Sequence, residues 1–260
     1  MAGSGKAHLR SAEEVLIQVQ DLVVEFPAAG KNTVKAVSGI SFDVMPGETL
    51  GLVGESGCGK STVARSLIQL PPPKSGSVVV NGVELTDLSE QELRPHRTQL
   101  QMIFQDPISS LNPRRRVADI IAEPLRVWGP HDENEQAEIV DRMLYAVGLD
   151  PEVARDKRPH QFSGGQCQRI SIARSLVLGP KVLICDEPVS ALDVSVQAQI
   201  LNLLRDLKAE YGLTLVFIAH DLAVVKNVSD RVAVMYLGKL CEVAEPDKLF
   251  SNAAHPYTAL

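Results

Sequence analysis

One stretch of the sequence, Gly54-Glu55-Ser56-Gly57-Cys58-Gly59-Lys60-Ser61-Thr62, constrains the fold more than any other. The apolar run 49–53 before it predicts a strand, and the apolar spacing of 61–70 after it predicts a helix that stops at three prolines. The glycines let the backbone take positive φ and turn several N–H groups inward, Lys60 can reach phosphate oxygens, and Ser61 can offer a hydroxyl to Mg²⁺. The stretch therefore predicts a phosphate cradle for a nucleoside triphosphate with magnesium.

Composition narrows the class of protein. The chain has 260 residues, enough to bury a sizeable core, and its 45% hydrophobic and 22% charged residues are typical of a globular protein. A net charge of −6 argues against a general nucleic-acid binder, and Arg114-Arg115-Arg116 indicates a solvated or partner-facing surface instead. The four cysteines, which show no Cys-x-x-Cys spacing, favour a reduced cytosol over a zinc site or disulfide framework; they are Cys58, Cys167, Cys185 and Cys241.

The segment before the cradle predicts a small sheet. Residues 1–14 are polar and are expected to form a flexible tail without a signal core. Consecutive strands with short connections favour an antiparallel sheet. These strands are expected over residues 15–20, 22–26 and 34–44, and one more short strand is expected after the cradle, over 76–82. Because no apolar run approaches the ~20 residues of a membrane span, we expect a protein that stays in the cytoplasm, soluble or peripheral to a membrane.

The second half alternates between helical and parallel-sheet patterns. From Leu88 to about His160 the apolar spacing is helical, which predicts an inserted helical subdomain. Strand, helix and strand patterns of the kind found in parallel sheets then follow, and a hairpin closes the domain. These elements are expected over residues 182–185, 196–207, 213–218, 231–236 and 240–243.

Two carboxylates follow the buried strand 182–185. Ligands of open α/β sheets sit at the carboxyl ends of strands, where this strand delivers Asp186 and Glu187. Asp186 would hold magnesium through water, and Glu187, on the opposite side of the pleat, can orient and polarise the attacking water. An Asp-Glu pair after an apolar run often occurs by chance. It indicates a catalytic site here because the chain also contains the phosphate cradle.

Gln105 and His220 are polar residues at predicted strand ends. Each alone is more often a satisfied structural side chain. However, both strands would lie beside the first two, and a γ-phosphate needs a water-positioning side chain and a hydrogen-bond donor near it. We therefore expect both residues at the nucleotide.

A second cradle is predicted at Ser163-Gly164-Gly165-Gln166, which opens the helix expected over 168–178. A serine hydroxyl and backbone N–H groups at a helix N-terminus form an anion site, although the same residues also suit an ordinary helix cap. The sequence contains two predicted cradles but one strand that ends in a magnesium-binding carboxylate. We therefore expect the second cradle to bind the nucleotide of a neighbouring subunit.

With these residues, the chain resembles the nucleotide-binding subunit of ATP-binding cassette (ABC) transporters over about residues 15–260. The resemblance implies an α/β P-loop NTPase (RecA-like) core with an N-terminal antiparallel β-subdomain and an inserted helical subdomain, about residues 88–165, that carries the signature motif. The ATPase domain would span 15–245, and 246–260 would begin a C-terminal extension. The matching motifs are the Walker A loop Gly54 to Thr62, the Q-loop Gln105, the signature Ser163 to Gln166, the Walker B strand Val182 to Glu187, the D-loop Ser190-Ala191-Leu192-Asp193 and the switch His220.

The resemblance also implies roles for these residues. Catalysis would rest on Glu187, His220 and Gln105, and Mg²⁺ would be held by Ser61, Gln105 and Asp186. An aromatic residue near the adenine is matched loosely by Phe26, where Tyr is commoner. Two cassettes would meet head to tail, with two ATP molecules between the Walker A loop of one and the signature of the other. We further expect Lys60 to be solvent-reachable without nucleotide.

Several further sequence segments are similar to those of the oligopeptide/dipeptide importer branch. Nickel and glutathione importers share much of the same sequence. The matching segments are Phe104-Gln105-Asp106-Pro107, Ser110 to Arg114, Glu187 to Gln197, His220 to Val225 and His255-Pro256-Tyr257-Thr258. The chain most resembles the second, F-type ATPase subunit of that branch. Such subunits usually continue into a cysteine-containing tail, sometimes with an iron–sulfur cluster. Because this sequence stops at Leu260, as a trimmed chain or a short variant, no cluster is assigned.

The branch implies an ATPase at the cytoplasmic face of the cell membrane, working with a second ATPase subunit, two transmembrane permeases and an extracytoplasmic substrate-binding protein. The cargo stays open between oligopeptides, dipeptides, nickel and glutathione. A soluble ABC ATPase that acts on ribosomes or DNA is the alternative from another class, and the single cassette and acidic charge argue against it. The segments that resemble importers argue against an exporter cassette.

Overall fold

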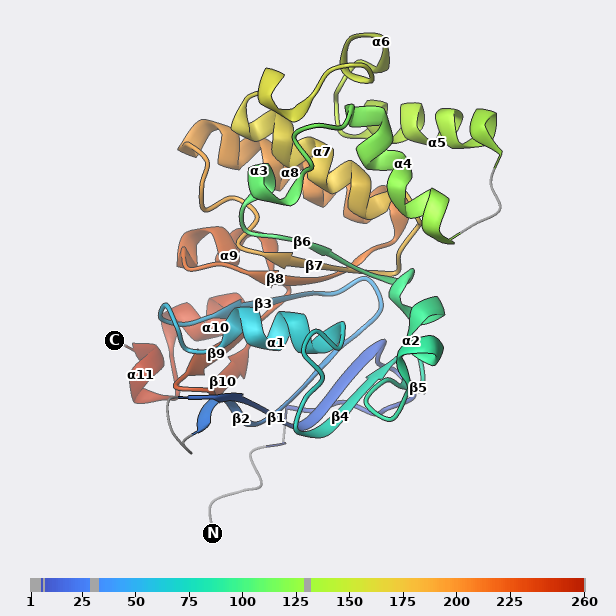
Figure 1. Ribbon diagram of the computed structural model, residues 1–260. Coiled ribbons are helices and arrows are strands. Elements are labelled where there is room, and N and C mark those ends of the chain that lie inside the picture. The colour runs from blue at the N-terminus through green and yellow to red at the C-terminus, as the bar shows by residue number, and fades with distance from the viewer. Residues whose placement is uncertain (1–5, 7, 29–32, 129–131, 260) are drawn as a thin grey trace. The chain divides into compact units, whose positions relative to one another are not determined.

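The computed structural model describes residues 6, 8–28, 33–128 and 132–259 (Figure 1). Parts of the expected tail over 1–14 and of the connection between the strands expected over 22–26 and 34–44, together with Leu260, lie outside the described residues. The chain divides into two compact units, residues 1–95 with 214–260, and residues 96–213. None of the described helices is long and apolar enough to cross a membrane.

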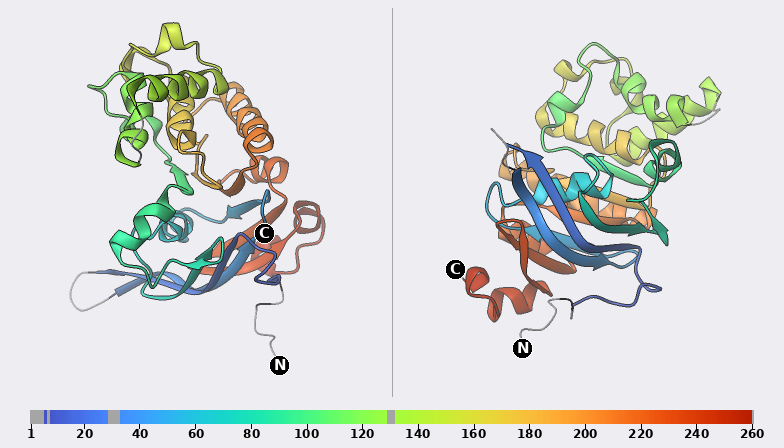
Figure 2. Two further views of the ribbon diagram at one scale, coloured as in Figure 1. Left: turned by 90° about the vertical axis from the view of Figure 1, so that its right-hand side faces the viewer. Right: turned by 60° about the horizontal axis from the view of Figure 1, so that its bottom comes forward.

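The first unit contains the expected antiparallel sheet. Its strand order is β2-β1-β4-β5, with β1 (Ile17–Pro27), β2 (Thr33–Val44), β4 (Ser75–Val80) and β5 (Val83–Glu84). The two strands expected over 15–26 form one strand, because the register shift between Val19 and Leu22 absorbs Asp21 at φ 49° as a bulge. In Figure 2, β1 and β2 run side by side as a long twisted ribbon.

A second group of strands in this unit carries the glycine-rich loop. Strand β3 (Thr49–Val53) pairs in parallel with β8 (Thr214–Ile218) and β9 (Arg231–Tyr236), and β9 pairs antiparallel with β10 (Lys239–Ala244). Every residue of β3 and β8 is buried, as their continuous apolar runs predict. The helices are α1 (Lys60–Leu67), α2 (Glu90–Arg97), which leads out of this unit, α9 (Leu222–Val228), α10 (Pro246–Ser251) and α11 (Pro256–Ala259).

A buried ionic cluster fastens the N-terminal segment to this unit. The fully buried carboxylate of Asp43 lies 2.5 Å from Arg10 Nη2 and 3.0 Å from Arg231 Nη1. Both arginines also contact Glu48. Burial alone would raise the pKa of Asp43, but hydrogen bonds from Arg10 and Arg231 hold it below its usual value. Residue 10, which falls within the expected flexible tail, therefore makes specific contacts.

The second unit combines a two-stranded parallel pair with a group of helices. Strand β6 (Leu100–Ile103) pairs with β7 (Val182–Asp186). The helical pattern expected from residue 88 onward is thus interrupted by β6, the strand that the Gln105 argument required. The remaining elements are α3 (Pro107–Ser110), α4 (Val117–Trp128), α5 (Glu133–Ala146), α6 (Pro151–Ala154), η1 (Pro159–Gln161), α7 (Gly164–Leu176) and α8 (Val194–Tyr211). Helices α4, α5 and α7 pack on one another (Figure 1).

Candidate nucleotide site

The glycine-rich stretch, residues 54–62, forms a tight loop between β3 and α1, which we call the phosphate loop. Gly54 and Gly59 have φ of 150° and 108°. A Cβ atom at Gly54 would lie 2.1 Å from the carbonyl oxygen of Met235, and one at Gly59 would lie 2.3 Å from that of Ala36. Both positions therefore require glycine for conformation and for space, and the strand–loop–helix expected from the sequence is present.

Lys60 is not solvent-reachable, contrary to the expectation stated above. Its side chain is only 5% exposed, and Nζ donates to the carbonyl oxygens of Gly54 at 2.7 Å and Glu55 at 2.9 Å. Without a phosphate, the ammonium group of Lys60 is hydrogen-bonded by two carbonyl groups of the loop that point inward, so the loop encloses it.

Backbone contacts from the hairpin between β9 and β10 support the phosphate loop from outside. The N–H of Gly238 donates to the carbonyl of Cys58 at 3.0 Å, and the carbonyl of Gly238 accepts from Ser38 N–H at 2.8 Å. The thiol of Cys58 is buried, which raises its pKa.

Phe26, the residue expected near the adenine, lies at the end of β1 opposite Val34 and is 39% exposed. Its role at the base stays a prediction.

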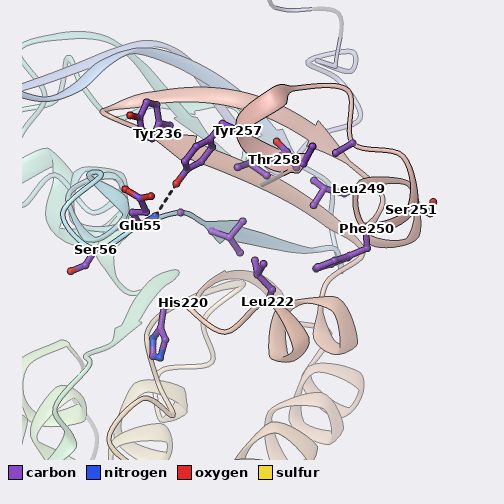
Figure 3. A pocket seen from close by; sticks show the side chains of 15 residues that line it. Glu55, Ser56, His220, Leu222, Tyr236, Leu249, Phe250, Ser251, Tyr257 and Thr258 are labelled. Atoms are coloured by element: carbon purple, nitrogen blue, oxygen red, sulfur yellow. Dashed lines mark hydrogen bonds between the residues drawn. The ribbon is translucent and has the colours of Figure 1, made fainter.

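A pocket of about 770 Å³ opens beside the phosphate loop, within the first unit (Figure 3). Its walls come from Val53 to Ser56, from His220 and Leu222 after β8, and from the C-terminal segment. The predicted switch residue His220 is exposed at this wall. In Figure 3 the hydroxyl group of Tyr257 points at the backbone of Glu55, to which a dashed hydrogen bond joins it.

The second unit brings together Gln105 and Glu187, which the sequence singled out separately. Nε2 of Gln105 donates to Oε2 of Glu187 at 2.9 Å. Glu187 follows β7 with φ of 49°, a left-handed conformation that costs a non-glycine residue on the order of 1 kcal/mol. Asp186, at the end of β7, is 2% exposed. The strand end therefore holds one nearly buried carboxylate and one that an amide side chain orients.

The loop after Gln105 is shaped by local hydrogen bonds. The carboxylate of Asp106 accepts from Ser109 N–H at 3.2 Å and Ile108 N–H at 2.9 Å and caps α3; these bonds hold its pKa below the usual value. Nη1 of Arg174, on α7, donates to the carbonyl of Ser110 at 2.6 Å. Helix α7 thus fixes the far end of this loop, a contact that sequence reasoning did not identify.

The signature segment, Ser163 to Gln166, forms a capping box at the start of α7. Ser163 Oγ accepts from Gln166 N–H at 3.3 Å, and Gln166 Oε1 accepts from Ser163 N–H at 3.0 Å. The helix-cap interpretation of these residues is therefore confirmed, and their role toward a neighbour's nucleotide stays a prediction. Gly164 and Gly165 leave the first two positions of the helix without side chains.

The predicted D-loop, Ser190 to Asp193, lies between β7 and α8. Ser190 donates to the carbonyl of Glu187 through N–H and Oγ, at 3.3 and 3.1 Å. Val196, in the first turn of α8, packs against Gly165, where a Cβ atom would lie 2.5 Å from Cγ1 of Val196. Sequence reasoning missed this contact, because the apolar spacing of α8 marks Val196 as buried without naming its neighbour.

Tyr257 and Tyr236 were also missed as neighbours of the phosphate loop. Their rings stack with centroids 4.3 Å apart. The segment His255-Pro256-Tyr257-Thr258 resembles importer sequences, but no pattern within it indicates a contact with a loop 202 positions earlier. The predicted site residues divide between the units: Phe26, residues 54–62 and His220 belong to the first, and the other residues, from Gln105 to Asp193, to the second.

Comparison with known proteins identifies the class. The model of the family described as "ABC transporter" matches residues 37–190, more than half of the chain. The chain therefore belongs to the ABC transporter family and is one of its ATP-binding cassettes, an ATPase.

Individual relatives narrow this class further. The oligopeptide transport ATP-binding protein OppF of Escherichia coli is 53% identical over 94% of this chain and 76% of its own length. The putative oligopeptide transport ATP-binding protein YkfD of Bacillus subtilis is 52% identical over 94% of this chain and 74% of its own length. Among solved structures, the cassette MJ0796 with ADP and Pi has a TM-score of 0.80 at 27% identity, covering 88% of this chain and 98% of that one.

Proposed function

We propose that this chain is an ATP-hydrolysing subunit of an ABC importer that energises the uptake of oligopeptides or dipeptides. The observation that carries the proposal is identity of about half of all residues, over 94% of the chain, to relatives named as oligopeptide transport ATP-binding proteins. The proposed complex holds a second ATPase subunit, two membrane permeases and an extracytoplasmic substrate-binding protein, with this chain at the cytoplasmic face of the membrane.

The phosphate loop supplies the binding step. On binding ATP, Lys60 exchanges the carbonyl oxygens of Gly54 and Glu55 for phosphate oxygens, while the loop's inward N–H groups donate to the same phosphates. The donors proposed for magnesium are the hydroxyl of Ser61, the amide oxygen of Gln105 and the carboxylate of Asp186. All three are hard oxygen ligands of the kind that this ion prefers, and the near-complete burial of Asp186 suits a carboxylate that faces a cation. A magnesium ion held by these residues would supply positive charge against the charge that develops on the phosphates.

Glu187 is the proposed general base. Its carboxylate accepts a hydrogen bond from Gln105 at 2.9 Å, which orients the group, and Glu187 is proposed to polarise the attacking water. His220 is proposed to donate toward the γ-phosphate from the end of β8. In the capping box Ser163 Oγ acts only as an acceptor, so the proposed contact to a partner's ATP uses the O–H of Ser163 as a donor together with N–H groups of the first helical turn.

Glutathione import is a second candidate function. The glutathione import ATP-binding protein GsiA of Salmonella paratyphi A is 51% identical over 94% of this chain and 40% of its own length. Glutathione is itself a small peptide derivative, so the same kind of ATPase would serve both cargoes. Nickel import is also compatible with the sequence, because nickel importers share much of it.

Deletion of the gene tests the cargo. The deletion strain should lose growth on di- or oligopeptides as nitrogen source and become resistant to toxic peptides. A plasmid copy of the parent chain should restore both traits, and the matched Glu187→Gln copy should restore neither. A deletion strain that takes up peptides normally contradicts the peptide assignment. Loss of nickel-dependent enzyme activity, or of growth on glutathione as sulfur source, would then identify the cargo.

A further inference from the structure

The C-terminal segment of the first unit contacts the phosphate loop directly. The N–H of Glu55, the second residue of the loop, donates to the hydroxyl oxygen of Tyr257 on α11 at 3.3 Å (Figure 3). The Tyr257 ring is half-buried and stacks on Tyr236 at 4.3 Å between centroids. Tyr236 ends β9, so this contact joins the loop, the strand and the C-terminal segment.

The direction of this hydrogen bond can be worked out from the peptide group. The carbonyl oxygen of Gly54 faces inward, because it accepts from Lys60 Nζ at 2.7 Å. In a trans peptide the C=O and N–H groups point in opposite directions, so the N–H of Glu55 faces out of the loop. Tyr257 therefore binds the outer side of the first turn and does not compete with phosphate for an inward donor.

The turn that carries Tyr257 is itself fixed. The carboxylate of Glu242, on β10, accepts from the N–H groups of Ala254 at 2.9 Å and His255 at 3.1 Å. Nδ1 of His255 in turn accepts from the N–H of Tyr257 at 3.2 Å. A chain of hydrogen bonds thus runs from β10 through residues 254–257 to the phosphate loop.

We propose that Tyr257 is a positioning residue for ATP binding, whose hydroxyl holds the first turn of the phosphate loop in the shape that presents Lys60 and the inward amides to the phosphates. The inference rests on the proposed role of residues 54–62 as the phosphate cradle. It also gives the C-terminal segment a function, since any partner or ligand that moves residues 254–258 changes the affinity for ATP.

The test is an equilibrium titration of the nucleotide-free chain with ATP that carries an N-methylanthraniloyl fluorophore on its ribose, in the presence of Mg²⁺. Tyr257→Phe removes only the hydroxyl and keeps the ring stack. It should raise Kd about two- to tenfold, the range that one net hydrogen bond gives. Tyr236→Phe removes the same atom from the neighbouring ring, whose hydroxyl makes no hydrogen bond to the described residues of the loop, and should leave Kd within about twofold of the parent.

Two further readouts separate positioning from general stability. In the nucleotide-free chain, the amide hydrogen of Glu55 should exchange faster in Tyr257→Phe than in the parent or in Tyr236→Phe. In the assembled ATPase, Tyr257→Phe should raise KM for ATP and leave kcat unchanged, because the hydroxyl does not reach the reacting atoms.

Lys60→Ala distinguishes failure of this inference from failure of the cradle. If Lys60→Ala loses binding while Tyr257→Phe binds as the parent does, the cradle stands and the role of Tyr257 is refuted. An equal loss in Tyr236→Phe and Tyr257→Phe would assign the effect to the ring pair and also refute it. Parental binding by Lys60→Ala would overturn the cradle and, with it, this inference.

Discussion

Gly165→Ala should destabilise the helical unit through one contact. The new Cβ atom would lie 2.5 Å from Cγ1 of Val196, more than about 1 Å inside an ordinary carbon–carbon contact. Overpacking of this kind costs about 1–3 kcal/mol, whereas alanine in place of glycine in a helix regains about 0.5–1 kcal/mol. We therefore expect a net loss of up to about 2.5 kcal/mol in the free energy of unfolding.

The neighbouring glycine offers a matched control. A Cβ atom at Gly164 would meet Leu192 Cδ2 at 3.5 Å, which is ordinary van der Waals contact. Gly164→Ala gains the same reduction in backbone freedom without the clash, so its stability should equal or slightly exceed that of the parent. The two substitutions change one hydrogen to one methyl group in the same helical turn.

Val196→Ala provides the rescue. It removes Cγ1, and the nearest remaining atom, Cβ, lies 3.8 Å from the Cβ position of residue 165. In a double-mutant cycle, the coupling between Gly165→Ala and Val196→Ala should be about 1–2 kcal/mol in favour of the pair. Urea unfolding followed by circular dichroism measures all four proteins. Equal stability of the two alanine variants, or no rescue by Val196→Ala, would refute the packing argument.

Two other predictions concern catalysis and pH. Glu187→Gln keeps the shape and the hydrogen bond from Gln105 but removes the base, so ATP should still bind while hydrolysis falls about 10²–10⁴-fold in a complex whose other site is disabled; turnover at the parental rate would exclude Glu187 as the base. The pKa of Asp43 is lower in the folded than in the unfolded chain, so its stabilising effect is present above about pH 4 and is lost as pH falls through the folded value. Asp43→Asn should therefore lower the melting temperature at pH 7 and narrow its gap to the parent at pH 3, and a gap that does not change with pH would contradict this.

The sequence predicts the phosphate loop well because its determinants are local. The apolar run of β3, the glycines and the apolar spacing of α1 lie within about twenty consecutive residues, so no distant contact is needed to specify them. The same holds for Asp186 and Glu187 after β7. The proximity of Gln105 to Glu187 followed from topology, since adjacent parallel strands end at one edge of a sheet.

Features that depend on distant contacts or on the direction of single peptide groups could not be predicted. The break expected between the strands over 15–20 and 22–26 is a bulge at Asp21, because pairing with both β2 and β4 keeps the strand continuous on either side of it. Lys60 is buried because the carbonyls of Gly54 and Glu55 face inward, which composition does not reveal. The contact of Val196 with Gly165 depends on how α7 and α8 pack, and apolar spacing alone gives no partner.

The contacts of the nucleotide-free phosphate loop fall into two kinds with opposite effects on ATP affinity. In the proposed binding step, the two hydrogen bonds that Lys60 makes inside the loop are exchanged for phosphate, so they would lower the affinity by stabilising the free state. The bonds from Gly238 to Cys58 and from Glu55 to Tyr257 lie outside the loop and would persist in that step, so they would raise the affinity by fixing the loop in advance. On this proposal, ATP affinity depends on the difference between the cost of breaking the inner hydrogen bonds and the benefit of the outer ones. Of these two sets, only the outer hydrogen bonds involve residues beyond the loop. Another part of the chain would therefore control ATP binding through the outer contacts.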